Sequence, residues 1–255
     1  MRIKLITLFM FAFNPALADY NSVNIAWDYN CPWMCNTPDK PGFLSELVTE
    51  IYRLNNIKIQ YQKYSWSLAK LEVKEGRILG ILSPSKDEAK GFYFPKKHLA
   101  KRHKCFFVNN DFNWTYTDER SLDTIKLGIS YRNSYNELTG YINTNINNLQ
   151  KIKLLNVENI YDIGFSLLKE KQFDALLIDH TSADYHLNKI RMANDFKKVG
   201  CLELEKIYLA FTPKYKNKSA YLAGILDKNI EILKKNNFLS SLKKKYNIDE
   251  FNFEE

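Results

Sequence analysis

Residues 71–83 read LEVKEGRILGILS, and residues 167–179 read LLKEKQFDALLID. Each stretch begins as the end of a helical segment, turns, and continues as a short apolar run typical of a buried parallel strand. Each ends in a polar residue, Ser83 in the first and Asp179 in the second. Because ligands bind beyond the carboxyl ends of strands in open α/β sheets, the two ends predict a cleft with one wall from each half of the chain.

Helix-like and strand-like segments alternate around the first of these stretches. The apolar spacing predicts strands at 23–27, 57–61 and 78–82, and helices at 43–54 and 65–75. This β-α-β-α-β order predicts a parallel sheet flanked by helices.

The second half of the chain repeats the order after a polar and aromatic stretch at 109–122, which we expect to connect two lobes. The segments expected there are strands at 125–129, 152–157, 175–178 and 208–211, helices from 134, at 158–170 and from 181, and two basic helices at the end. The fold class is therefore α/β. One lobe is expected to comprise residues 19–110 and 205–255, and the other residues 111–204.

The N-terminus has the features of a secretory signal peptide. Arg2 and Lys4 precede an apolar run at 5–13, and residues 16–18 (ALA) supply small side chains at the two positions that signal peptidase reads. The apolar run is too short to span a bilayer, which takes about 20 residues. We expect cleavage after Ala18 and export to the periplasm, since no later segment is apolar enough to span a membrane.

The charge of the chain is basic, with a formal net charge of +8. Much of this charge comes from late lysines spaced along helix-like stretches at 234–235 and 243–245. Such spacing is typical of a solvated helix face. We therefore expect no nucleic-acid partner, and we expect a monomer.

The chain contains four cysteines, and an even number in an oxidising compartment predicts disulfides. Pro32 favours a bent loop that brings Cys31 and Cys35 together, so we favour that pair. Whether Cys105 and Cys201 also pair is open. A zinc site is the alternative, but no histidine has ligand spacing near these cysteines, so no metal or other cofactor is expected.

A series of further landmarks follows a fixed order along nearly the whole mature chain. They are the aromatic–proline loop at 28–33, Pro41-Gly42-Phe43, Trp66, Gly76 before an apolar strand, FYFP at 92–95, Phe106-Phe107, Ser121-Leu122, GISYRNSY at 128–135, FDALLID at 173–179, YLAF at 208–211 and Lys245-Tyr246. In this order they resemble the family-3 solute-binding proteins of polar amino acid ABC transporters. The resemblance is to a divergent branch with a Cys-Pro-x-x-Cys first loop.

The resemblance implies the type II periplasmic-binding-protein fold, in which two α/β lobes are joined by a hinge with crossover strands. It also implies a function without catalysis. Such a protein captures a small polar, amino-acid-like solute between its lobes and delivers it to the membrane permease of an ABC transporter.

Four positions in the second lobe follow from this resemblance and from local chemistry. Asp179 corresponds to the residue that receives the ligand's ammonium, and its alternative role is to cap the following helix. Arg132, Ser134 and Tyr135 lie between a strand and a helix, where backbone N–H groups and a guanidinium attract an anion. Ser134 has the alternative role of a helix cap.

First-lobe candidates come from aromatic and polar side chains near strand ends. Trp33 and Trp66 are candidates to line the cleft and stack on an apolar or cationic ligand, although single aromatics are more often core residues. Asp28 and Ser83 are candidate polar contacts, and Ser83 has the alternative role of starting a turn before Pro84.

One position departs from the family pattern. Members carry an arginine for the ligand's α-carboxylate shortly after the first-lobe Ser or Thr, whereas Glu88 stands at the matching position in 83–90 (SPSKDEAK). A carboxylate does not bind a carboxylate at neutral pH, so a cationic, neutral or differently held solute is indicated. Two alternatives stay open: a periplasmic enzyme resembling cyclohexadienyl dehydratase with Glu88 as general acid, and a ligand-sensing subunit of a separate receptor.

Overall fold

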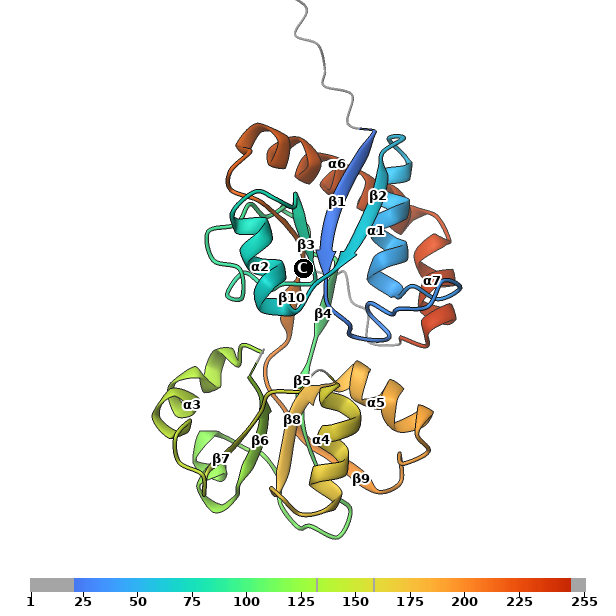
Figure 1. Cartoon of the computed structure of the whole chain (residues 1–255). Helices are drawn as coiled ribbons and strands as arrows, with labels where there is room; N and C mark the ends of the chain where they lie inside the picture. Colours follow the sequence, from blue (N-terminus) through green and yellow to red (C-terminus); the bar gives the residue numbers. More distant parts are fainter. Residues whose placement is uncertain (1–20, 132, 158, 249–255) are drawn as a thin grey trace, which may run out of the picture.

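The computed structural model describes residues 21–131, 133–157 and 159–248. The signal peptide expected at 1–18 lies outside these residues. The described chain forms two α/β lobes, one above the other in Figure 1, and passes between them twice. The expected fold class, two α/β lobes with crossover strands, is therefore confirmed.

The first lobe is built on a four-stranded sheet in the order β11-β3-β1-β2. Strand β1 (Ser22–Trp27) pairs in parallel with β2 (Lys58–Lys63) and β3 (Gly80–Leu82), as the β-α-β-α-β pattern predicts. Strand β11 (Leu209–Phe211) joins β3 in the antiparallel direction after the chain returns from the second lobe. The helices of this lobe are α1 (Phe43–Arg53), α2 (Trp66–Lys74), α6 (Lys216–Lys235) and α7 (Phe238–Tyr246).

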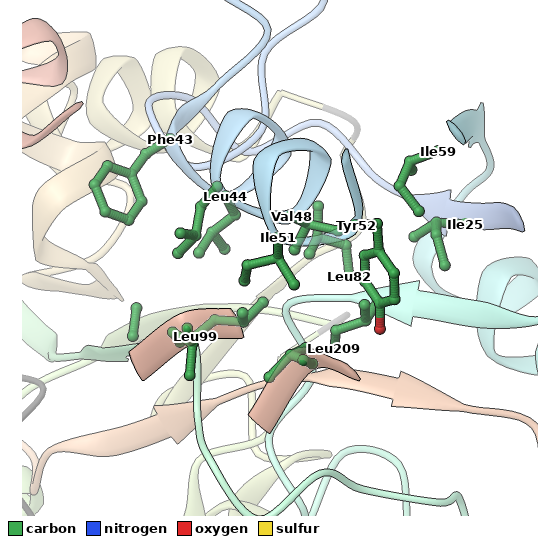
Figure 2. Packing of buried hydrophobic residues seen from close by; sticks show 14 of the residues in the cluster. Ile25, Phe43, Leu44, Val48, Ile51, Tyr52, Ile59, Leu82, Leu99 and Leu209 are labelled. Carbon is green, nitrogen blue, oxygen red and sulfur yellow. The ribbon is translucent and has the colours of Figure 1, made fainter. Parts of the chain in front are cut away.

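Helix α1 supplies the centre of the first-lobe core. Its buried side chains recur every three or four residues and therefore share one face of the helix. Figure 2 shows Val48 and Tyr52 of α1 beside Leu82 of the sheet, within one hydrophobic cluster. The Tyr52 hydroxyl donates to the carbonyl oxygen of Leu222 in α6 at 2.9 Å, so the same face also fixes the C-terminal helices. Burying each large apolar side chain contributes roughly 1.5–3 kcal/mol.

The second lobe has a five-stranded mixed sheet in the order β7-β6-β8-β5-β9. Its parallel part joins β6 (Leu127–Ser130) to β7 (Ile152–Leu155) and β8 (Ala175–Asp179). Strand β5 (Lys104–Asn109) runs antiparallel to both β8 and β9 (Phe196–Cys201). The helical elements are the 3₁₀ turns Glu119–Thr124 and Asn136–Leu138, and the helices α3 (Thr139–Asn145), α4 (Ile160–Lys169) and α5 (His180–Lys189).

A short two-stranded ribbon connects the lobes (Figure 1). Strand β4 (Ala100–Arg102) pairs in antiparallel fashion with β10 (Glu205–Ile207), and Arg102 lies opposite Glu205. The expectation that 109–122 connects the lobes was wrong. That stretch packs inside the second lobe, where the ring of Tyr116 stacks on Phe106 at 4.2 Å. Residues 104–109, which the sequence assigned to the first lobe, likewise pair with second-lobe strands.

Both cysteine pairs form disulfides. The Cys31–Cys35 bond confirms the favoured pairing, and Cys105–Cys201, which the sequence left open, joins opposed residues of β5 and β9. Within the described residues there is no cluster of His, Cys, Asp and Glu suited to a metal ion. No helix among them is long and apolar enough to cross a membrane.

The two disulfides close loops of very different length, 96 residues for Cys105–Cys201 and 4 for Cys31–Cys35. In the chain-entropy model the longer loop gives the larger stabilisation. We expect the Cys105→Ser/Cys201→Ser double variant to lose about 2–4 kcal/mol of unfolding free energy, measured by urea denaturation. The Cys31→Ser/Cys35→Ser variant is the comparison and should lose less unfolding free energy. An equal or larger loss in that variant would contradict the larger stabilisation expected from the longer loop.

Candidate functional site

A cavity of about 80 Å³ lies between the lobes. A space of this size holds several water molecules or a small solute, since one water needs roughly 10–15 Å³ by the same measure. Its walls come from the first lobe, the crossover ribbon and the second lobe. The lining residues are Asp28, Tyr29, Asn30, Met34, Trp66, Ser83, Glu88, Arg102, Ser130, Asn133, Val157, Ile160 and Tyr161.

The cavity lies where the parallel strands end. Asp28 directly follows β1, Ser83 directly follows β3, and Ser130 is the last residue of β6. Strand ends from both lobes thus meet at one space, and Ser83 stands in its wall as the first opening stretch of sequence predicts. The second-lobe end in this wall is that of β6, whereas Asp179 at the end of β8, which the second stretch predicted there, is not a lining residue.

Asp28 and Trp66 form one unit of the first-lobe wall. The Asp28 carboxylate accepts a hydrogen bond from the backbone N–H of Tyr29 at 2.8 Å and from that of Trp66 at 2.9 Å. Trp66 is the first residue of α2, so the carboxylate lies at a helix N-terminus, where a negative charge is stabilised. Asp28 therefore fixes the position of Trp66, whose half-buried side chain lines the cavity.

Ser83 has two unusual features. Its backbone has φ of 74°, a left-handed conformation that costs a residue with a side chain about 1–3 kcal/mol. The residue is 2% exposed and lines the cavity, yet its hydroxyl has no hydrogen-bond partner among the described residues. A buried unpaired hydroxyl costs a further 1–3 kcal/mol or so. Both costs are typical of a position shaped by a ligand.

Glu88 takes part in a buried charge network. Its Oε2 accepts hydrogen bonds from the Ser85 N–H at 3.0 Å and from Arg102 Nη2 at 2.8 Å. Arg102 Nε donates to Glu205 Oε2 at 2.7 Å, and Lys104 Nζ donates to the same oxygen at 2.9 Å. The four charged side chains are each at most 9% exposed. The negative charge that the sequence placed at Glu88 is thus paired with a guanidinium from the crossover ribbon.

Burial and mutual attraction act in opposite directions on these groups. Burial alone would raise the pKa of the Glu205 carboxyl, but the positive charges of Arg102 and Lys104 outweigh it and lower that pKa to about 2. Burial would lower the pKa of Arg102, and the Glu88 and Glu205 carboxylates instead raise it. For Lys104, burial and the neighbouring Arg102 charge lower the pKa. The network is therefore held together by charge pairing.

The loop at 28–35 joins the first lobe to the second. Asn30 Oδ1 accepts hydrogen bonds from the Tyr161 hydroxyl at 2.6 Å and from the Ser182 hydroxyl at 2.8 Å. Trp33 Nε1 donates to Asp179 Oδ1 at 3.0 Å. These bonds cross from one lobe to the other, so the structure shows the lobes closed on each other.

Trp33 and Asp179 lie beside the cavity and are not among its lining residues. Trp33 is 1% exposed and packs edge-on against Phe43 in the first-lobe core. Asp179 caps α5 by accepting from the Ser182 N–H at 2.8 Å, so the helix-cap role is confirmed. Its Oδ1 also accepts the hydrogen bond from Trp33 Nε1. Its buried Oδ2 has no hydrogen-bond partner among the described residues. A ligand role for either residue stays a prediction.

Tyr135 holds the end of β6 in place through its hydroxyl. Its hydroxyl accepts from the Ser130 N–H at 2.8 Å and donates to the Ser130 carbonyl oxygen at 3.2 Å, which positions Ser130 in the cavity wall. Ser134 does not cap a helix, since the next helical turn begins at 136, and its buried hydroxyl has no partner among the described residues. Arg132 lies outside the described residues.

Sequence reasoning missed several lining residues. Arg102 left little signal, because it stands in the basic run at 101–104 (KRHK), which looks like an exposed segment before the apolar residues at 105–108. Asn30, Asn133 and Tyr161 left none, since their place depends on how the two lobes approach each other.

Comparison with known proteins supports the fold. No family model and no curated protein sequence matches the chain. Solved structures do match: a substrate-binding protein of an ABC uptake transporter from Streptococcus pneumoniae with bound histidine has a TM-score of 0.74 and 19% identity over 92% of this chain and 95% of that one. The fold is that of the two-lobe substrate-binding proteins.

Two further structures show the range of this fold. A putative L-cystine ABC transporter protein from Listeria monocytogenes has a TM-score of 0.72 and 18% identity over 92% of this chain and 99% of that one. A histidine kinase sensor domain with similarity to periplasmic binding proteins has a TM-score of 0.71 and 15% identity over 89% of this chain and 96% of that one. The expected resemblance to solute-binding proteins is thereby confirmed as a likeness of fold.

The charge network predicts a specific loss of stability in acid. Because the folded pKa of Glu205 is lowered from 4.5 to about 2, its contribution is complete above pH 4.5 and is lost as the pH falls from 4.5 to 2. The Glu205→Gln variant should lose about 3–5 kcal/mol at neutral pH and should lack that part of the acid dependence. Urea denaturation at a series of pH values measures both effects.

The matched control is Glu203→Gln, which changes an exposed carboxylate two residues away. It should keep the wild-type pH dependence between 4.5 and 2. An unchanged acid profile in Glu205→Gln would show that the buried pairing does not hold this carboxylate ionised.

Proposed function

We propose that this chain is an exported binding protein that captures a small polar, amino-acid-like solute between its lobes and delivers it to the permease of an ABC transporter. The observation that carries the proposal is Ser83, which is buried and strained at the wall of a cavity shared by both lobes and whose hydroxyl has no partner in the described part of the chain. A solute in that cavity would supply the missing hydrogen bond.

The closed arrangement supports capture. Hydrogen bonds from Asn30 and Trp33 across the lobes hold the two lobes against each other beside the cavity. Residues from both lobes line the space, and a solute that contacts both walls stabilises the closed form relative to an open one. This is the mechanism by which hinged lobes trap a ligand.

Delivery to a transporter is supported by two features. The sequence at 1–18 has the pattern of an export signal, which would place the mature chain in the periplasm. Structures with the same fold include the histidine-bound protein and the putative cystine protein, both described as parts of ABC transporters. No cofactor is needed for this role.

A sensing role is the second candidate, because one structure with this fold is a histidine kinase sensor domain. Solute capture is common to both roles, and co-purification with a permease or with a receptor subunit distinguishes them. The enzyme alternative has less support. The carboxylate of Glu88 is engaged by Arg102 and by the Ser85 N–H, which suits a binding wall better than a proton donor.

Mass spectrometry of natively purified, then denatured protein tests the proposal. We expect release of a small polar molecule, which should raise the unfolding temperature when added back to stripped protein. In Ser83→Ala, affinity for that molecule should fall roughly tenfold, since one buried hydrogen bond is lost. The stripped variant should be no less stable than the stripped wild type.

The matched control is Ser240→Ala on the exposed side of α7, which should bind as the wild type does. Release of no small molecule, together with no thermal shift across a panel of amino acids, amines and small acids, would contradict the proposal. Turnover of the bound molecule that is lost in Glu88→Gln would favour the enzyme instead.

A further inference from the structure

The positive charge of the chain is concentrated in one lobe. Residues 21–102 and 205–248, which comprise the first lobe and the ribbon, contain 23 Lys and Arg and 11 Asp and Glu, a net charge of +12. Residues 103–204, which include the second lobe, contain 12 Lys and Arg and 13 Asp and Glu, a net charge of −1. The four carboxylates at 249–255 still leave the first-lobe side at +8. The two lobes therefore present different potentials to a charged surface.

Nearly all of the first-lobe cations are lysines. The three arginines form ion pairs within the same residues: Arg53 with Glu50 at 2.6 Å, Arg77 with Glu72 at 2.8 Å, and Arg102 with Glu88 and Glu205. The other 20 cations are lysines. Protein–protein interfaces are enriched in arginine and depleted of lysine, whereas clustered lysines suit the diffuse negative charge of lipid headgroups. This composition favours a lipid surface over an acidic protein face.

Helix α6 presents a basic face to solvent. Its opposite face packs on the first-lobe core through Leu222, Leu226 and Ile230. The exposed residues recur at helical spacing and so share one side of the helix. They are Lys216, Asn217, Ala220, Tyr221, Gly224, Lys228, Ile232 and Lys235. We call this side the α6 face; it carries three lysines and no carboxylate.

The two carboxylates of α6 are only partly exposed and are engaged beside this face. Asp227 accepts hydrogen bonds from the backbone N–H groups of Lys96 and Lys97 at 3.0 and 2.8 Å. Glu231 lies 3.5 Å from Lys97 Nζ and 3.1 Å from Lys234 Nζ. These ion pairs leave the three lysines of the α6 face available to an external anion.

The α6 face also exposes apolar surface, and it lies far from the site. Tyr221 and Ile232 are 45% and 44% exposed, and lysine stems, tyrosine rings and aliphatic side chains together suit the headgroup boundary of a bilayer. Figure 1 shows α6 at the end of the first lobe away from the second lobe. The described chain ends at Ile248, near Pro32 and Lys189 at the other end of that lobe. The α6 face is therefore remote from the start of the acidic stretch at 249–255.

We propose that the α6 face docks the first lobe on the anionic headgroup layer of a membrane. The inference goes beyond solute binding and does not depend on it. Docking through α6 places the second lobe and the interlobe cavity away from the lipid, so the cavity stays accessible. Each lysine near an anionic lipid surface strengthens the association about fivefold.

Vesicle sedimentation tests the choice of lipid. Mature protein, from residue 19 onward, is mixed with vesicles of phosphatidylcholine alone or of phosphatidylcholine and phosphatidylglycerol in equal parts. We expect binding to the mixed vesicles at low salt and none to phosphatidylcholine. Binding should be lost at high salt, because the Debye length falls from about 30 Å at 0.01 M to about 3 Å at 1 M.

Removal of the three lysines tests the face. In Lys216→Gln/Lys228→Gln/Lys235→Gln, partitioning onto the mixed vesicles should fall about a hundredfold, since each lysine contributes about fivefold. The three side chains are exposed, so the variant should keep the wild-type unfolding temperature.

The matched control removes the same charge from the second lobe. Lys169→Gln/Lys171→Gln/Lys189→Gln changes three exposed lysines there. Its net charge equals that of the α6 variant, yet its partitioning should stay within about fivefold of wild type, because these side chains lie far from the lipid.

A fluorescent label locates the contact without removing charge. Gly224 on the α6 face and Gly140 in α3 both have open space where a Cβ would stand, so a cysteine fits at either position. The four native cysteines are in disulfides, so an environment-sensitive maleimide attaches to the introduced thiol. On addition of mixed vesicles, the emission of labelled Gly224→Cys should shift to the blue, and that of labelled Gly140→Cys should not.

Several results would overturn the inference. They are equal association with neutral and mixed vesicles, a loss of binding in the second-lobe variant as large as in the α6 variant, and a blue shift at residue 140 but not at residue 224. Absence of binding to mixed vesicles at low salt would also overturn it and would leave an acidic protein face as the partner of the basic lobe. Vesicle binding is measured without solute, so its failure leaves the proposed solute-binding function standing.

Discussion

The ion pair between Arg102 and Glu88 is the contact on which the site depends. Arg102 belongs to the crossover ribbon, and Glu88 lies on the turn after β3 of the first lobe. The guanidinium also binds Glu205, its opposite residue in the ribbon, so one side chain links both crossover strands to the cavity wall. Because removing one partner of a buried pair leaves an uncompensated charge, this network constrains the wall and the hinge together.

The loop at 28–35 connects the first lobe to the second through hydrogen bonds of Asn30 and Trp33. The Cys31–Cys35 disulfide closes this loop, and Gly42 packs against it with φ of 111°. A Cβ at residue 42 would come within 2.5 Å of the Trp33 carbonyl oxygen, so only glycine permits this approach. The loop is thereby held where Asn30 and Trp33 reach across to the second lobe. Backbone packing in this loop therefore supports the contacts between the lobes.

Much of the fold could be read from the sequence, and what was missed has a common cause. Apolar spacing predicted α1, β1 and β8 nearly to the residue because each is buried on a regular face. Strands β4, β5, β9 and β10 were missed, since their lysines and Arg102 break the apolar pattern, and their pairing partners are distant in sequence. For the site, strand-end topology predicted Asp28 and Ser83. Arg102, Asn30 and Tyr161 depend on how the lobes meet, which no local pattern encodes.

Closure around a solute is the central claim, and small-angle X-ray scattering measures it most directly. The radius of gyration of stripped protein is compared with that of the same protein reloaded with the small molecules recovered from its own denatured form. The account predicts a smaller radius after reloading, because a solute that contacts Ser83 and the second-lobe wall favours the closed form. An unchanged radius in protein shown by mass spectrometry to have rebound the molecule would contradict it.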